Sequence, residues 1–362
     1  MISISLCMIV KDEEGVLGQC LDSAKELVDE IIIVDTGSKD KTKEIAYRYT
    51  DMVYDFQWTD DFSAARNYSF SKATKDYIMW LDADDIILKK DLDQLKLLKK
   101  QLNLEYDVII MKYVVQRDPN GQETYACYRE RLVKRSNNFK WHDPIHEHIN
   151  FYGKVLNTEI AITHTGVTRN SKRNLSILKK FIENSNSFHP KYLFYYAREN
   201  NALGNLDEAI KYYLKFLDIE PDIYSPYSEA CIQLSQIYKA QNQDKLALKT
   251  LIRSFEYEPV RAEILCLIGK YYIDKKDYCT AIYWYKLALS IPKPTLSWMF
   301  VMEEYWEFIP YIELCHCYYH MGDIDLALSY HKKAAQLKPK HPAVVHNQKF
   351  FNTLAKASKC HL

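Results

Sequence analysis

One stretch of the chain, residues 77–85, constrains its fold more than any other. Tyr77 to Leu81 form a short, mostly apolar run typical of a buried strand, and Asp82, Asp84 and Asp85 follow it directly. Because carboxylates are costly to bury without a partner, such a strand is expected to deliver them to a cation. Hard ions such as Mg²⁺ are held by one or two carboxylates together with substrate phosphate oxygens. The pattern therefore predicts a metal site at the end of a buried strand.

Strand and helix patterns alternate around this stretch. Strands are predicted at 2–10, 30–35, 52–56 and 77–81, and helices at 11–27, from Ser38 or Asp40 onward, at 63–73 and at 91–102. This alternation is typical of a parallel sheet with helices on both faces. Ligands of such sheets bind beyond the carboxyl ends of the strands, which places Val10, Asp35 and Asp82 at one edge.

The pattern changes after residue 102. Strands are predicted at 107–116 and 123–134, joined by the turn at 118–121, and a last strand at 159–163 ends in His164. A histidine-rich segment that contains Glu147, residues 140–148, lies between the last two of these strands. We therefore expect an α/β domain with a mixed sheet over residues 1–170.

The remainder of the chain predicts an all-α repeat domain at 190–340, joined by a connecting helix or linker at 171–189. The sequence around one alanine recurs at spacings of 38, 34 and 46 residues, at Ala209, Ala247, Ala281 and Ala327. Prolines that would stop a helix lie 12 residues after three of these, at Pro221, Pro259 and Pro339. The TPR period is 34 residues, so we expect four TPR-like units. The aromatic-rich insertion at 293–309 is either an extra helix capping the stack or a piece of binding surface, and 341–362 is left as a C-terminal tail.

Composition excludes several classes of protein. Lys+Arg and Asp+Glu both number 48, which argues against a general nucleic-acid binder. Nine scattered cysteines indicate free thiols in a reducing cytosol, so a cytoplasmic location is expected. Neither a signal peptide nor a membrane span is expected. Zinc at residues 315–320 is disfavoured because helical residues two apart point to different faces. A homodimer stays an open alternative.

Three segments, residues 31–42, 63–67 and 80–85, together resemble family 2 inverting glycosyltransferases with the GT-A fold. With His146-Glu147, His164-x-Gly166 and the helical repeats, the chain is similar to TPR-containing glycosyltransferases, which include enzymes that glycosylate bacteriocin peptides on Cys or Ser. The resemblance implies a nucleotide-sugar donor, expected to be a UDP-sugar. It also implies a Mg²⁺ or Mn²⁺ ion, and a peptide or protein acceptor bound by the TPR half.

The resemblance further implies roles for individual residues. Those expected to bind the nucleotide-sugar are Val10 (through its backbone), Glu13, Asp35 (to the base), Arg66 and Asp82. Asp84 and His164 are expected to hold the metal ion. Glu147 takes the place of the catalytic base, which removes the proton of the acceptor in a single displacement. Asp85, His146 and His148 are left without a role.

Structural alternatives remain open for these residues. Asp35 could form only a turn, Arg66 could cover its helix, Glu147 could pair with Arg131 or Lys140, and His164 could be a core histidine. Two other functions also stay open. One is the same chemistry on a cell-envelope glycan or lipid-linked acceptor, with the repeats binding a partner protein. The other is a non-enzymatic TPR scaffold on a degenerate nucleotide-binding domain.

Overall fold

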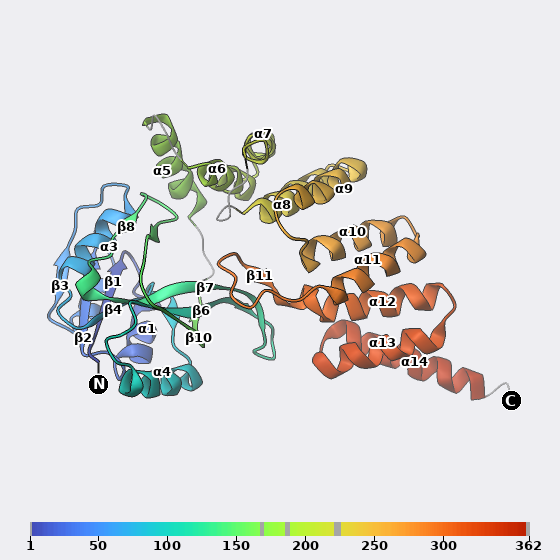
Figure 1. The fold of residues 1–362 in the computed structure, drawn as a ribbon, viewed down its shortest axis with the longest axis horizontal. Coiled ribbons are helices and arrows are strands. Elements are labelled where there is room, and N and C mark those ends of the chain that lie inside the picture. Colours follow the sequence, from blue (N-terminus) through green and yellow to red (C-terminus); the bar gives the residue numbers. More distant parts are fainter. Residues whose placement is uncertain (1, 167–169, 185–188, 221–225, 360–362) are drawn as a thin grey trace. The chain divides into compact units, whose positions relative to one another are not determined.

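A computed structural model describes residues 2–166, 170–184, 189–220 and 226–359, with the backbone alone for 355–359. The chain divides into two compact units (Figure 1). The first consists of Met1–Phe188 and Leu296–Val301, and the second of His189–Thr295 and Met302–Leu362. The predicted order, an α/β domain with a mixed sheet followed by an all-α domain, is confirmed.

The first unit is built on a nine-stranded sheet in the order β3-β2-β1-β4-β7-β6-β10-β5, with β11 paired to β7. Its strands are β1 (Ile4–Val10), β2 (Glu30–Asp35), β3 (Val53–Asp55), β4 (Tyr77–Trp80), β5 (Asp85–Ile86), β6 (Val108–Arg117), β7 (Glu123–Lys134), β10 (Val155–His164) and β11 (Val301–Met302). β1 to β4 run parallel, whereas β7 is antiparallel to both β4 and β6. A separate ribbon pairs β8 (Trp141–His142) with β9 (His148–Ile149).

Helices cover both faces of this sheet (Figure 1). They are α1 (Leu17–Ala24), α2 (Thr42–Ala46), α3 (Phe62–Ser71) and α4 (Lys89–Gln101). A fifth helix, α5 (Ser171–Asn184), follows β10 and also belongs to the first unit. Successive strand residues point to opposite faces, so Leu6 and Met8 join one core with α1 and α4, whereas Cys7 joins the other with α3. Of the connecting segment expected at 171–189, residues 185–188 lie outside the described residues.

The loop after β1 differs from the prediction, because the helix expected from residue 11 begins only at Leu17. Asp12 has a positive φ of 55°, a conformation that Asp tolerates better than most residues. Its backbone N–H donates to Ser38 Oγ (2.9 Å), and its Oδ1 accepts from the N–H of Lys39 (2.7 Å). These bonds join the loop after β1 to the loop after β2, at the edge of the sheet where Val10 and Asp35 are register partners.

In the part of the second unit that the structure describes, four helix pairs follow one another along the chain (Figure 1). They are α6 (Lys191–Ala202) with α7 (Leu206–Leu217), α8 (Tyr227–Ala240) with α9 (Asp244–Arg253), α10 (Ala262–Asp274) with α11 (Tyr278–Ser290), and α12 (Phe308–His320) with α13 (Ile324–Leu337). The four alanines that define the repeat are all buried in the second helix of a pair. Pro221 lies outside the described residues.

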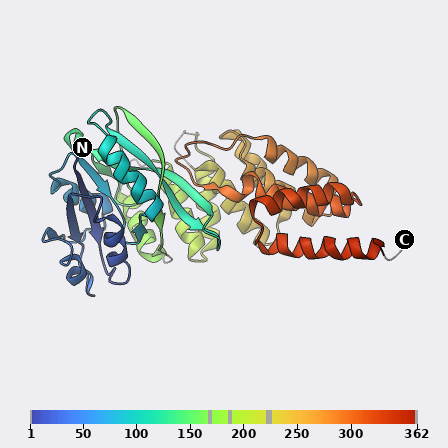
Figure 2. The same cartoon turned by 90° about the horizontal axis from the view of Figure 1, so that it is seen from below.

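Two segments of the second half had no clear prediction. For the insertion at 293–309 the two alternatives were an extra capping helix and a piece of binding surface, and residues 296–302 form no helix. Leu296–Val301 belong to the first unit, where Phe300 stacks on Tyr125 with ring centroids 4.5 Å apart. The segment assigned as a tail contains a single long helix, α14 (Pro342–Lys359) (Figure 2). Among the described residues, no helix is long and apolar enough to cross a membrane.

Candidate active site

Asp82, Asp84 and Asp85 form a tight turn directly after β4, as predicted. The N–H of Asp85 donates to the carbonyl of Asp82 (3.0 Å), and the N–H of Asp82 donates back to Asp85 Oδ2 (3.1 Å). Their side chains differ in exposure: Asp82 is 36% exposed and Asp84 27%, whereas Asp85 is fully buried. The three carboxylates therefore meet three different environments.

The carboxyl end of β10 brings His164 to this turn. His164 pairs with Asp85 across β10 and β5, and the N–H of Thr165 donates to the carbonyl of Asp84 (2.8 Å). His164 Nδ1 lies 3.5 Å from Asp84 Oδ1 and 3.5 Å from Asp85 Oδ1. One ligand atom of each residue lies within 4.8 Å of the others, a group that could hold a metal ion.

The chemistry of this group fits a divalent cation. His164 Nδ1 and Asp85 Oδ1 are buried, and neither atom has a hydrogen-bond partner among the described residues. Buried polar atoms without partners are uncommon and call for an explanation such as an ion. The carboxylates of Asp84 and Asp85 also raise the pKa of His164 to about 10. The two carboxylates therefore stabilise a positive charge on His164, at the place where a metal ion would bind.

Gly166 explains the second half of the His-x-Gly pattern. A Cβ atom at this position would lie 1.9 Å from Asp84 Oδ2 and 2.9 Å from His164 Cε1. The side chain of Asp84 can approach the end of β10 only because residue 166 has no side chain.

Gly166→Ala is expected to displace the Asp84 carboxylate and weaken Mn²⁺ binding by roughly tenfold or more, by analogy with the loss of a supporting contact at a metal site. The clash involves the end of a flexible side chain, so the unfolding temperature should change little. Gly18→Ala in α1 is the matched control, because its Cβ would make only ordinary contacts at 3.9 Å. Titration of both variants with Mn²⁺, followed by thermal unfolding, checks the prediction; equal affinities would contradict it.

Arg66 in α3 joins two of the predicted site residues. Its Nη2 donates to Asp82 Oδ1 and its Nε to Glu147 Oε1, both at 2.7 Å. The guanidinium is buried against two neighbouring indole rings, 5.0 Å from the centroid of Trp80 and 4.8 Å from that of Trp141. Arg66 thus fixes the positions of Asp82 and Glu147 relative to each other, although 65 residues separate them in the chain.

The alternative of a surface ion pair between Glu147 and Arg131 or Lys140 is wrong. Glu147 pairs with Arg66, and its side chain is only 13% exposed. Arg131 pairs elsewhere, with Asp85. Of the neighbouring histidines, His148 Nδ1 lies 2.9 Å from Asp143 Oδ2, and His146 has a positive φ of 52°.

Val10 and Asp35 lie side by side at the ends of β1 and β2. Asp35 is buried; its Oδ1 accepts from the N–H groups of Gly37 and Ser38, both at 2.9 Å. Its Oδ2 is buried and has no hydrogen-bond partner among the described residues. The carbonyl of Val10 accepts from the N–H of Thr36 (2.9 Å). The turn reading of Asp35 therefore accounts for one of its two oxygens and leaves the other for a ligand.

Glu13 lies near the acidic turn. Burial, together with the negative charges of Asp84 and Asp82, raises its pKa to about 7. Its backbone N–H donates to Thr42 Oγ1 (2.7 Å), which holds it at the loop beside β2. Glu13 therefore titrates in the neutral range, unlike a solvated glutamate.

Glu13→Gln is expected to flatten the pH dependence of stability in the absence of divalent ions. A carboxyl group with a raised pKa contributes its full stability below its ordinary pKa of 4.5 and loses it as the pH rises through about 7. The variant should therefore be more stable than the wild type at pH 8, with this advantage much reduced at pH 5. Denaturant unfolding with a chelator present checks this; a constant difference between the two pH values would contradict it.

The sequence missed one part of this site. Arg131 in β7 is fully buried, and its Nη1 donates to Asp85 Oδ2 at 3.0 Å. Its guanidinium lies 3.8 Å from the ring centroid of Trp80 and 4.3 Å from that of Tyr113. An arginine beside the apolar residues Leu132 and Val133 in a predicted strand was the available signal, but its partner could not be read from the pattern.

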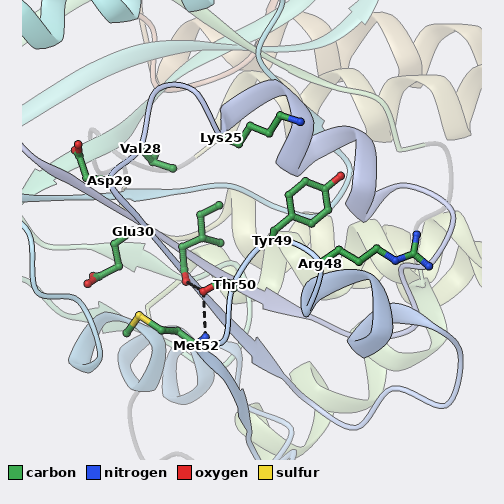
Figure 3. A pocket seen from close by; sticks show the side chains of 9 residues that line it. Lys25, Val28, Asp29, Glu30, Arg48, Tyr49, Thr50 and Met52 are labelled. Carbon is green, nitrogen blue, oxygen red and sulfur yellow. Dashed lines mark hydrogen bonds between the residues drawn. The ribbon is translucent and has the colours of Figure 1, made fainter.

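A separate pocket of about 600 Å³ lies at the other end of β2 (Figure 3). Glu30 and Ile31 line it from the start of β2, roughly 17 Å from Asp35 at the rise per residue of a strand. Thr50 donates to the carbonyl of Ile31 (2.8 Å) and accepts from the N–H of Met52 (3.0 Å). This pocket therefore lies away from the predicted site residues.

Comparison with known proteins bears on the order of the two parts of the chain. Residues 5–156 match the model of glycosyl transferase family 2, and residues 191–223 match that of a tetratricopeptide repeat. A match to glycosyl transferase family 2 is thus followed in this chain by a match to a tetratricopeptide repeat, the order predicted from the sequence.

Two relatives illustrate the match. A TPR repeat-containing protein of Synechococcus elongatus is 37% identical over 147 residues, which cover 41% of this chain and 35% of that protein. The glycosyltransferase SunS of Bacillus subtilis is 26% identical over 231 residues, covering 60% of this chain and 53% of SunS. This chain thus aligns with about a third to a half of the length of these relatives. A solved structure of MamA covers 47% of this chain at 20% identity, with a TM-score of 0.38.

Proposed function

We propose that this chain is a metal-dependent inverting glycosyltransferase that moves a sugar from a nucleotide-sugar, a UDP-sugar in the first instance, to a peptide or protein acceptor bound by the repeats. The observation that carries the proposal is the meeting of two groups at one edge of the sheet. Asp84, Asp85 and His164 form a candidate cation site, and Arg66 links Glu147 to the same acidic turn.

The donor is proposed to bind along the carboxyl ends of β1, β2 and β4. The buried Oδ2 of Asp35, which lacks a partner among the described residues, suits an N–H group of the base. Asp84, Asp85 and His164 would hold Mg²⁺ or Mn²⁺. Such an ion neutralises the negative charge that develops on the departing diphosphate.

Glu147 is proposed to accept the proton of the acceptor. As the bond from the acceptor atom to the anomeric carbon forms, the bond to the diphosphate oxygen breaks, and the proton passes to the carboxylate. Arg66 holds Oε1 of Glu147, which leaves Oε2 for this proton. Partial burial opposes ionisation of Asp82, but Arg66 and Arg131 outweigh it and lower the Asp82 pKa. Asp82 therefore stays charged and keeps Arg66 in place.

The acceptor class is supported by the second unit and by the likeness to SunS, a glycosyltransferase. Stacked helical repeats form extended concave surfaces that bind peptides. Asn201 of α6 and Gln233 of α8 form a hydrogen-bonded pair of polar side chains on the first helices of neighbouring repeats (3.2 Å). Such side chains suit the backbone of an extended peptide.

The test is an assay of the full chain with a set of UDP-sugars, Mn²⁺, and either flexible peptides containing Ser and Cys or small glycans. Mass spectrometry of the acceptor and release of UDP are both measured. Glycosylated peptide supports the proposal, transfer to glycans alone favours the envelope alternative, and absence of any donor binding in calorimetry favours the scaffold.

The role of the repeats needs substitutions rather than truncation, because Leu296–Val301 belong to the first unit and deletion of the repeats would remove them. The double variant Asn201→Ala/Gln233→Ala should raise the KM for peptide without changing UDP release in the absence of peptide. Lys249→Ala, at an exposed position of α9, is the matched control. An unchanged KM for peptide in the double variant would contradict this docking site.

A further inference from the structure

In the mechanism above Asp85 is a proposed ligand of the ion, but its ion pair with Arg131 has no assigned role. Both side chains are fully buried, and they form an ion pair at 3.0 Å. Burying two charges is costly even when they are paired, and such pairs are often no more stabilising than apolar residues of the same size. Stability alone therefore gives a weak reason for an arginine at this position.

The hydrogen bonds and ring contacts of Arg131 connect it to the acidic turn and, through Tyr113, to His164. Its Nη1 donates to Asp85 Oδ2 and to the carbonyl of Trp80 (3.3 Å), the last residue of β4. Its guanidinium contacts the face of Tyr113, and that ring packs edge-on against His164 with centroids 5.9 Å apart. One side chain therefore contacts the strand before the turn, a carboxylate within it and the ring that supports the histidine.

This pairing gives the two carboxylate oxygens of Asp85 different surroundings. Its Oδ2 is occupied by Arg131 and by the N–H of Asp82. Its Oδ1 is buried without a hydrogen-bond partner among the described residues, and lies 3.5 Å from His164 Nδ1. With Oδ2 held on one side, Oδ1 is directed toward the atoms of Asp84 and His164.

We propose that Arg131 is a positioning residue of the cation site, which acts through Asp85 by directing Oδ1 of that carboxylate to the ion. This inference rests on the proposed function, because it assumes that the ion binds at Asp84, Asp85 and His164. Groups that support metal ligands change affinity by roughly 10–100-fold when they are removed. Arg131 is therefore expected to set the affinity for the metal without contacting it.

The experiment is a Mn²⁺ titration of the full chain, followed by the free-Mn²⁺ signal in electron paramagnetic resonance. Arg131→Met should weaken Mn²⁺ binding by roughly 10–100-fold. Arg131→Lys should lie between Arg131→Met and the wild type, because lysine restores the charge but not the planar stacking. Arg261→Met is the matched control, since Arg261 pairs with the buried Glu263 in the second unit (2.8 Å).

A second variant separates positioning from simple loss of stability. Arg131→Met leaves a buried charge on Asp85, whereas Asp85→Asn/Arg131→Met leaves none. The double variant should regain the unfolding temperature of the wild type and bind Mn²⁺ no more weakly than Asp85→Asn alone, because Arg131 acts through Asp85. Wild-type affinity in a folded Arg131→Met, or a further loss of affinity in the double variant relative to Asp85→Asn, overturns the proposal.

Asp84→Ala in the same titration distinguishes this failure from failure of the proposed function. If Asp84→Ala binds Mn²⁺ like the wild type, the ion does not bind at this turn, and the metal site of the proposed function is wrong. If Asp84→Ala loses Mn²⁺ and the Arg131 variants retain it, only the positioning role is overturned.

Discussion

Asp84→Ala is expected to abolish Mn²⁺-dependent release of UDP from the donor. Of the three proposed ligands, Asp84, Asp85 and His164, the side chain of Asp84 is the most exposed. Its Oδ1 lies 3.5 Å from His164 Nδ1. Removal of this carboxylate deletes a ligand and a negative charge together, so Mn²⁺ affinity should fall by more than the roughly 10–100-fold typical of a supporting residue. The rate of UDP release and the Mn²⁺ dissociation constant are both measured.

The control for this prediction is Asp93→Ala. Asp93 is an exposed aspartate in α4 that pairs with Lys89 at 2.9 Å, and surface ion pairs of this kind contribute little. This variant should match the wild type in both measurements. If Asp84→Ala keeps its Mn²⁺ dependence, the acidic turn is not the metal site, whatever the activity of the protein.

Glu147→Gln is expected to lower kcat for sugar transfer by roughly 10²–10⁴-fold, the usual contribution of a positioned general base. Glutamine has the same shape and can still accept the hydrogen bond from Arg66, so the linkage of α3 to the acidic turn should survive. Binding of UDP and Mn²⁺ should therefore be unchanged. Single-turnover transfer rates, compared with calorimetric binding of UDP, check the prediction.

Glu159→Gln provides the matched control for that substitution. Glu159 lies in β10 and accepts a hydrogen bond from the Tyr128 hydroxyl (2.7 Å), which glutamine also accepts. It should transfer sugar at the wild-type rate. A Glu147→Gln enzyme with nearly wild-type kcat would assign the base to another residue.

The prediction from sequence was most successful where a pattern is local. The buried strand before Asp82 and the repeated alanines of the helix pairs are each encoded within a few residues. Period-2 and 3.6-residue patterns report which face of an element is buried, and that is enough to order strands and helices. The loop after β1 was the local failure, because the left-handed backbone at Asp12 depends on bonds to Ser38 and Lys39 in another loop.

Local patterns could not predict which residues far apart in the sequence form ion pairs or stack on each other. The structural alternative for Glu147 was an ion pair with Arg131 or Lys140. In the structure Glu147 pairs with Arg66, and Arg131 pairs with Asp85. Which arginine faces which carboxylate depends on the pairing of β4 with β7 and on the packing of α3. The sequence left two alternatives for the insertion at 293–309 for the same reason, since Tyr125, on which Phe300 stacks, lies far away in the chain, in β7.

The sequence by itself determined the residues of the acidic turn, because a buried strand that ends in carboxylates already implies an edge of a sheet and a ligand with positive charge. Only the tertiary structure decided how those carboxylates differ. Asp85 is buried against Arg131, Asp82 is held by Arg66, and Asp84 faces His164 from the end of β10. Burial and charge pairing are set by which strands lie side by side, and that information is distributed over the whole sheet.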